Sequence, residues 1–147
     1  MQERWEASRT ESVQVQRAGG SNILKMREER GTYYVPITIN GIPMEFIFDT
    51  GASIISISAA EAIFLMRQGK LLESDILGTS YFSDATGTIS EGTRINLREV
   101  QIGNKKLTNV EASVVHNMEA PLLLGQSALN RFGKVTIDYR NNQLTLE

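Results

Sequence analysis

Apolar and polar positions alternate along most of the chain after residue 31, in short runs separated by turn-forming residues. The first two runs cover residues 33–39 and 42–48, with Asn40-Gly41 between them. A period of two is typical of strands with one buried face, and Asn-Gly favours the two-residue turn of a β-hairpin. The pattern therefore predicts two antiparallel strands, the second of which leads directly into Asp49.

More strands are expected toward the C-terminus. Residues 79–82 and 88–100 flank the turn-forming run 83–87, which predicts a hairpin with a polar tip. A further strand is expected at 106–116, and a last strand pair at 135–139 and 143–146 around Asn141-Asn142.

Two segments have helical patterns. Ser58 and Glu61 form a capping-box pattern at the start of residues 59–68, where apolar residues recur at helical spacing until Gly69. A second short helix is expected at 127–132. The chain is therefore predicted to be all-β with one or two short helices.

The first thirty residues differ in composition from the rest of the chain. Residues 1–30 are polar and rich in Glu, Arg, Gln and Ser, which favours an N-terminal extension or linker, while residues 31–147 form the folded domain. The alternative is that a few apolar residues of this segment add strands at an interface. These residues are Val13, Val15, Ile23, Leu24 and Met26.

Composition excludes several kinds of chemistry. The chain has no cysteine and one histidine, so it lacks thiol nucleophiles and thiolate zinc sites. Its net charge of −2, with mixed acidic and basic residues, leaves no electrostatic footprint for nucleic acid. The compartment stays open, and a periplasmic or membrane-tethered location through a segment outside this sequence is one alternative.

Asp49 is the main candidate for chemistry, because it follows the apolar run Phe46-Ile47-Phe48 and precedes Thr50-Gly51. Peptide hydrolysis by carboxylates alone needs two of them sharing a proton, and the chain has one Asp-Thr-Gly. Asp138 lies in another apolar strand but lacks Thr-Gly after it, so we expect it to bind the following turn, 140–142. His116 is expected to be a structural residue.

Two motifs together carry a resemblance to a known family. The run Asp49-Thr50-Gly51-Ala52-Ser53 resembles the active-site loop of aspartic peptidases, and Leu123-Leu124-Gly125 resembles their hydrophobic-hydrophobic-glycine element. Their order and spacing over residues 33–147 are similar to the retropepsin-like, single-lobe peptidases and most similar to the bacterial branch of that family. The resemblance implies a closed or partly open β-barrel.

The resemblance also implies an activity. Asp49 would meet its copy in a homodimer, and the pair would activate a water that attacks a peptide bond in an extended protein or peptide substrate. This mechanism requires no metal or organic cofactor. Thr50 would bond across the two-fold axis, while Gly51 and Ala52 support the loop. The hairpin tip would form a flap over the substrate. Its residues are Asp84, Ala85, Thr86 and Gly87.

This sequence departs from the pepsin-like enzymes at one position, where it resembles several retroviral relatives, and from the retroviral enzymes at two others. Ala52 stands where many pepsin-like enzymes have a serine that bonds the catalytic carboxylate, so activity is expected to peak at mildly acid pH. Ser53 and Gln126 replace an acidic residue and an arginine that brace retroviral dimers. Dimer strength is therefore the open part of this interpretation.

Two other functions fit the same residues. A catalytically silent module could keep the fold and bind an extended peptide, and its association state would distinguish it from an enzyme because a monomer has one Asp49. A structural β-barrel, in which Asp-Thr-Gly is an ordinary turn, is the weaker alternative.

Overall fold

The computed structural model describes residues 22–83 and 85–147, and this part of the chain is mostly β-strand with two short α-helices and one 3₁₀ turn. The helical elements are α2 (Ala59–Arg67), α3 (Gln126–Leu129) and η1 (Glu73–Asp75). The strands are β1 (Ile23–Lys25), β2 (Arg27–Glu29), β3 (Thr32–Ile39), β4 (Ile42–Phe48), β5 (Ile55–Ser58), β6 (Ile76–Ser83), β7 (Ile89–Ile102), β8 (Lys105–Val115), β9 (Leu123–Leu124), β10 (Val135–Asp138) and β11 (Gln143–Leu146).

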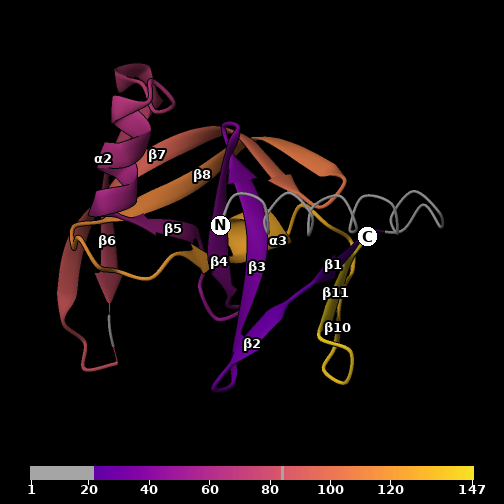
Figure 1. Cartoon of the computed structure of the whole chain (residues 1–147). Helices are drawn as coiled ribbons and strands as arrows, with labels where there is room; N and C mark the ends of the chain where they lie inside the picture. The colour runs from indigo at the N-terminus through magenta and orange to yellow at the C-terminus, as the bar shows by residue number, and fades with distance from the viewer. Residues whose placement is uncertain (1–21, 84) are drawn as a thin grey trace.

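The strands form two sheets. The larger has the order β2-β3-β4-β9-β5-β8-β7-β6, and the smaller has the order β1-β11-β10. In Figure 1, α2 stands at one end of the large sheet near β6 and β7, and the small sheet lies at the opposite end. The prediction of a mostly β chain with short helices is confirmed.

The large sheet closes partly on itself. β3 pairs with β4 along its length and also with β7, where Thr38 lies opposite Gln101 and Ile39 opposite Val100. This second pairing makes the sheet a partial ring. Its inner face holds a core of fully buried apolar residues, among them Phe46, Ile55 and Leu97.

The β3–β4 hairpin follows its sequence pattern closely. Asn40 and Gly41 have φ values of +47° and +87°, the left-handed pair that a two-residue hairpin turn requires. Along β3, the alternate residues Val35, Ile37 and Ile39 are buried. The predicted hairpin is confirmed, and it directs β4 toward Asp49.

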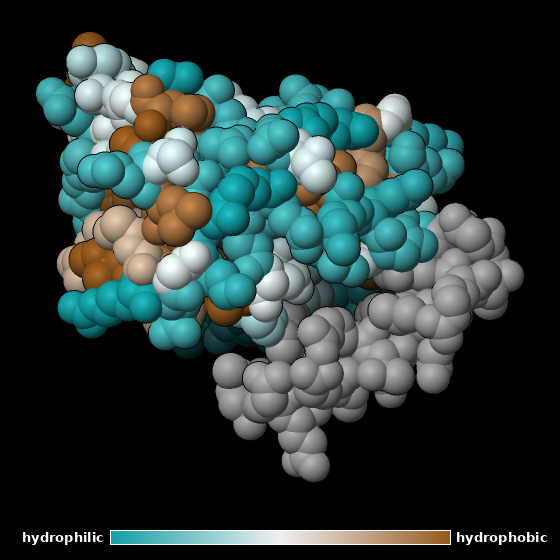
Figure 2. Space-filling model, turned by 90° about the horizontal axis from the view of Figure 1, so that it is seen from above, coloured by the Kyte–Doolittle hydropathy of each residue, from teal (hydrophilic) through white to brown (hydrophobic). Residues whose placement is uncertain are grey.

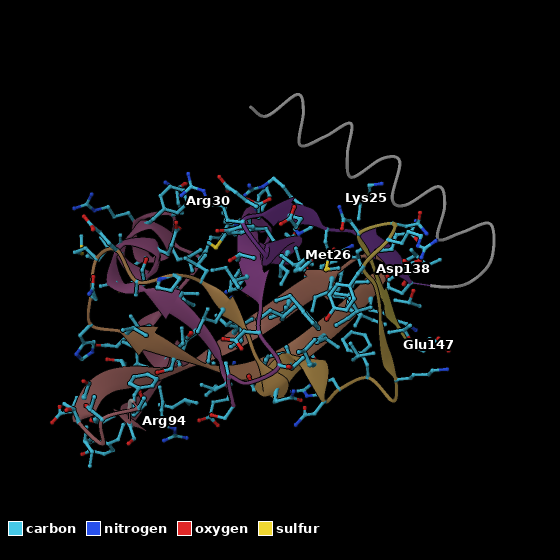
Figure 3. The ribbon with its side chains drawn as sticks, turned by 90° about the horizontal axis from the view of Figure 1, so that it is seen from below. Lys25, Met26, Arg30, Arg94, Asp138 and Glu147 are labelled. Carbon is cyan, nitrogen blue, oxygen red and sulfur yellow. The ribbon has the colours of Figure 1, made fainter. Side chains whose placement is uncertain are left out.

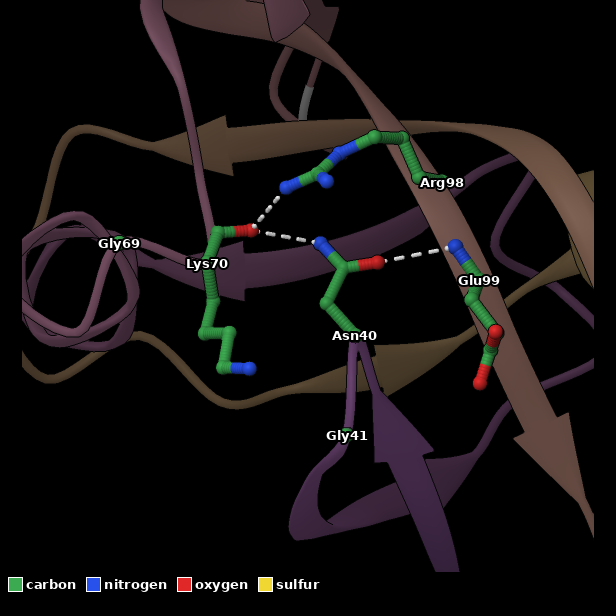
Figure 4. A pocket seen from close by; sticks show the side chains of 6 residues that line it. All are labelled: Asn40, Gly41, Gly69, Lys70, Arg98 and Glu99. Carbon is green, nitrogen blue, oxygen red and sulfur yellow. Dashed lines mark hydrogen bonds between the residues drawn. The ribbon is translucent and has the colours of Figure 1, made fainter.

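Asn40 also joins three segments through its amide. Its Nδ2 donates to Lys70 O at 2.7 Å, and its Oδ1 accepts from Glu99 N at 2.9 Å. Arg98 donates to the same Lys70 carbonyl at 2.9 Å, as Figure 4 shows. These hydrogen bonds connect the β3–β4 turn and β7 to the segment that follows α2, and the residues that make them line a polar pocket.

The two helices differ in how far they match the sequence pattern. Ser58 caps α2 by accepting from Glu61 N at 3.1 Å, and Gly69 follows with a φ of +70°. The second helix, expected over 127–132, is α-helical only through Leu129. The chain then continues in tight turns, with Phe132 N donating to Leu129 O at 3.1 Å.

Residues 22–30, which the sequence analysis assigned to the extension, contribute β1 and β2. Leu24 and Met26 are each 2 % exposed. Figure 3 shows Met26 turned toward the strands, whereas Lys25 projects outward. The buried Asn22 donates to Ile102 O at 3.1 Å and accepts from Asn104 N at 2.8 Å. The rest of the expected extension, residues 1–21, lies outside the described residues.

Exposed apolar side chains gather mainly at one end of the molecule. Figure 2 shows them on the upper face near the end that carries α2, within a surface that is otherwise mostly hydrophilic. Phe64 on α2 and Leu72 just beyond it are 43 % and 45 % exposed. No helix in the described ranges is long and apolar enough to cross a membrane.

Asp138 binds the turn that follows it, as the sequence predicts. Its carboxylate accepts from Asn141 N at 3.0 Å and from Asn141 Nδ2 at 2.8 Å. These side-chain and backbone hydrogen bonds hold the pKa of Asp138 below its usual range, because they favour the charged carboxylate. The carboxylate therefore stabilises the β10–β11 turn.

The lowered pKa gives a pH-dependent prediction for Asp138→Asn. The stability that the charged carboxylate contributes is present above its unfolded-state pKa of about 3.9 and is lost as the pH falls through the lower folded-state value. The variant should therefore unfold at lower urea than wild type at about pH 7, and this difference should shrink as the pH falls below about 4. A difference that stays constant over this range would contradict the assignment.

Candidate functional site

Asp49 lies directly after the last residue of β4, where an apolar strand reaches the surface. Phe46, three positions earlier, is fully buried, while Asp49 is half-buried and Thr50 is exposed. The backbone N–H of Asp49 donates to Leu124 O at 3.2 Å. The carboxylate is thus attached to a buried strand but retains access to solvent.

The strands that precede and follow Asp49 in the sequence, β4 and β5, are not neighbours in the sheet. β9 lies between β4 and β5: Phe48 pairs with Leu124 in parallel, and Ser56 pairs with Leu123 in antiparallel. The connection that carries Asp49, residues 49–54, must therefore pass across the end of β9. The next residue after β9 is Gly125.

Gly125 allows this crossing because it has no side chain. A Cβ at this position would lie 2.5 Å from Ile54 O and 2.7 Å from Ala52 O, both of which are backbone atoms. Such distances are far inside van der Waals contact. The glycine of Leu123-Leu124-Gly125 is therefore required for the close approach of the two backbone segments.

The segment that follows Asp49 is a tight turn around its carboxylate. Ala52 N donates to Asp49 O at 3.2 Å, and Gly51 N donates to Asp49 Oδ1 at 3.0 Å. A Cβ on Gly51 would lie 3.3 Å from the same Oδ1, which is a tight contact. Gly51 thus contacts the Asp49 carboxylate through its backbone N–H, and Ala52 closes the turn through its own N–H.

The start of α3 holds the Asp49 loop through three hydrogen bonds. Gln126 N donates to Ala52 O at 2.8 Å, and Gln126 Nε2 donates to Thr50 O at 3.0 Å. Ser127 Oγ accepts from Ile55 N at 2.8 Å. The sequence analysis noted Gln126 only as a departure and missed Ser127, because no local pattern connects either residue with a loop so distant in the sequence.

The expected flap is the end of the β6–β7 hairpin. Ala85, Thr86 and Gly87 are exposed there, and Gly87 has a φ of +86°, while Asp84 lies outside the described residues. Tyr81 and Ile89 beside the tip are 68 % and 69 % exposed. The predicted hairpin is present, with apolar side chains available on its arms.

The other two titratable residues considered from the sequence, His116 and Asp138, bind neighbouring residues of the fold. His116 Nε2 lies 2.8 Å from Thr93 Oγ1 on the exposed surface, and Asp138 is engaged by its own turn. No group of three or more metal-binding side chains occurs in the part of the chain that the structure describes. Asp49 therefore remains the main candidate among the residues that the sequence pointed out.

The two carboxylate oxygens of Asp49 differ in their hydrogen bonds. One oxygen of Asp49, Oδ1, accepts from Gly51 N, and no donor to Oδ2 is found among residues 22–83 and 85–147. A carboxylate held in this way can accept a proton from water or donate one when protonated. Carboxylate-only hydrolysis needs both roles at once, from two groups.

Comparison with known proteins gives two findings. A family model described as "gag-polyprotein putative aspartyl protease" matches residues 35–131, a range that includes both motifs. A crystal structure of a retropepsin-like aspartic protease from Rickettsia conorii superposes with a TM-score of 0.61 at 27% sequence identity, over 86% of this chain and 89% of that chain. Comparison with curated protein sequences gave no match.

The crossing at Gly125 predicts a large stability loss for Gly125→Ala. The added methyl would collide with the backbone carbonyls of Ala52 and Ile54, and moving them apart would break the hydrogen bond from Gln126 N to Ala52 O, so we expect the free energy of unfolding to fall by about 3 kcal/mol. Gly133→Ala is the matched control, because its Cβ would meet Glu147 O at an ordinary 3.7 Å. Equal urea midpoints for the two variants would contradict this reading of the glycine.

Proposed function

This chain belongs to the gag-polyprotein aspartyl protease family and to the bacterial type of the retropepsin-like proteases, and on that premise we propose that it is an aspartic endopeptidase active as a homodimer. The substrate is an extended segment of a protein or peptide. The reaction is hydrolysis of a peptide bond by water, with the two Asp49 carboxylates of the dimer as acid and base.

The observation that carries this proposal is the position of Asp49. Its carboxylate is oriented by Gly51 N, half-buried at a sheet end and fixed by the crossing at Gly125. Asp138, the other carboxylate considered, serves its own turn. We therefore assign the second acid to a second copy of the chain, because a two-fold axis near Asp49 would supply the identical group.

The proposed chemistry follows from two carboxylates in contact. They share one proton, because two adjacent negative charges are unfavourable. The charged member takes a proton from a water, which attacks the scissile carbonyl carbon, and the protonated member hydrogen-bonds the carbonyl oxygen as it gains charge. The proton then passes to the leaving nitrogen, and the C–N bond breaks.

The supporting residues have separate proposed roles. The Thr50 side chain lies on the exposed loop, where its hydroxyl can bond the partner loop across the axis. The β6–β7 tip around Ala85–Gly87 covers the substrate backbone, and the exposed Tyr81 and Ile89 offer it apolar contacts. Substrate selection by such contacts is expected to be weak.

The first test is Asp49→Asn. An amide cannot act as the base, so the variant should cleave no member of a peptide library that wild type cleaves between about pH 3 and about pH 8, with new termini identified by mass spectrometry. Asp138→Asn is the matched control and should retain cleavage, because Asp138 lies in the β10–β11 turn.

The enzyme assignment would be overturned by a wild-type dimer without peptidase activity. If wild type is a dimer by sedimentation and cleaves nothing across this pH range, the chain is not a peptidase. Binding of the same peptides by that inactive protein would then support a silent peptide-binding module.

A mixing experiment tests whether the site is shared between subunits. When wild type and Asp49→Asn are combined in equal amounts and allowed to exchange subunits, about one quarter of the dimers carry two Asp49 residues. Activity per total chain should therefore fall to about one quarter of the wild-type value. A value of about one half would mean that each chain works alone.

A further inference from the structure

The peptide group between Thr50 and Gly51 is held from both sides. Its N–H, on Gly51, donates to Asp49 Oδ1 at 3.0 Å. Its C=O, on Thr50, accepts from Gln126 Nε2 at 3.0 Å. The Gln126 amide, this peptide group and the Asp49 carboxylate therefore form one continuous chain of hydrogen bonds.

We propose that Gln126 is a positioning residue, which fixes the orientation of the Thr50–Gly51 peptide and through it the carboxylate of Asp49. The inference rests on the proposed peptidase function for its catalytic consequence, but the contact itself is a property of one chain. Gln126 thus acts within its own subunit, on the loop that carries Asp49.

The orientation needs a partner because a turn peptide next to glycine rotates easily. Gly51 has no side chain to restrict the backbone, and rotation of the peptide would point the Thr50 carbonyl toward the Asp49 carboxylate. Two oxygens facing each other repel, while the carboxylate would lose its N–H donor. The Gln126 amide favours the productive orientation by binding the carbonyl on the other side, and such chains of bonds strengthen one another.

Gln126 itself is well placed for this task. Its backbone N–H donates to Ala52 O at 2.8 Å, so its main chain is fixed to the far end of the same turn. Its side chain is half-buried at the start of α3, next to the required Gly125. Because the backbone of Gln126 is already fixed, less conformational entropy is lost when its side-chain amide binds Thr50 O.

The first variant is Gln126→Met, which keeps the length of the side chain and removes the donor. We expect kcat to fall roughly three- to tenfold with KM little changed, because one hydrogen bond that orients the reacting group is lost. In the same protein, the Gly51 amide should exchange with solvent faster than in wild type, as followed by NMR.

Gln126→Glu gives a readout that a merely structural role would not produce. A protonated glutamic acid can donate to Thr50 O, whereas its carboxylate repels that carbonyl, and free glutamate titrates near about pH 4.3. The activity ratio of Gln126→Glu to Gln126→Met should therefore exceed one below that pH and drop below one by about pH 6.

Gln101→Met is the matched control, since Gln101 Nε2 also donates to a backbone carbonyl, Gly103 O, at 3.3 Å but lies on β7. It should leave cleavage and Gly51 exchange unchanged. The inference would be overturned if Gln126→Met kept the wild-type cleavage rate and the wild-type rate of Gly51 amide exchange. It would also be overturned if the activity ratio of Gln126→Glu to Gln126→Met did not change with pH. In either case, cleavage by wild type would still uphold the proposed function. If wild type is an inactive dimer, the proposed function fails, and Gly51 exchange still decides whether Gln126 holds the peptide.

Discussion

The crossing of the Asp49 connection over the end of β9 is the constraint on which the site depends. β4 and β5 follow one another in the chain, yet β9 separates them in the sheet. The crossing brings two backbones so close that only glycine fits at residue 125. It also brings the amide of Gln126 against Ala52 O, so backbone groups that would lose water at the crossing find partners in each other.

The same crossing explains how a carboxylate can end an apolar strand. A charged group close to the core needs donors or water, and burying it without them would be costly. Here the turn supplies one donor from Gly51, and the rest of the carboxylate stays half-exposed. The fold thus leaves open the side of Asp49 that a second copy of the chain would approach.

Local patterns predicted local structure well. The turn at Asn40-Gly41, the Ser58 cap of α2 and the bonds of Asp138 to Asn141 all involve residues within a few positions of each other. The motif pair predicted the family and fold. The contact between Gln126 and Thr50 spans 76 positions, and the pairing of β1 with β11 joins the first described strand to the last. Nothing in the periodicity of either segment identifies its partner, so these features required the structure.

β9 has only two residues, yet it pairs with both β4 and β5. Its partners lie far away in the sequence, so forming these pairs means closing a long chain loop, which costs entropy before the contacts compensate for it. The Asp49 turn can form early as an isolated turn, but its fixed geometry waits until Leu123, Leu124 and Gly125 have docked. The Asp49 loop can therefore reach its final geometry in a nascent chain only after this late strand has been synthesised and has paired with β4 and β5.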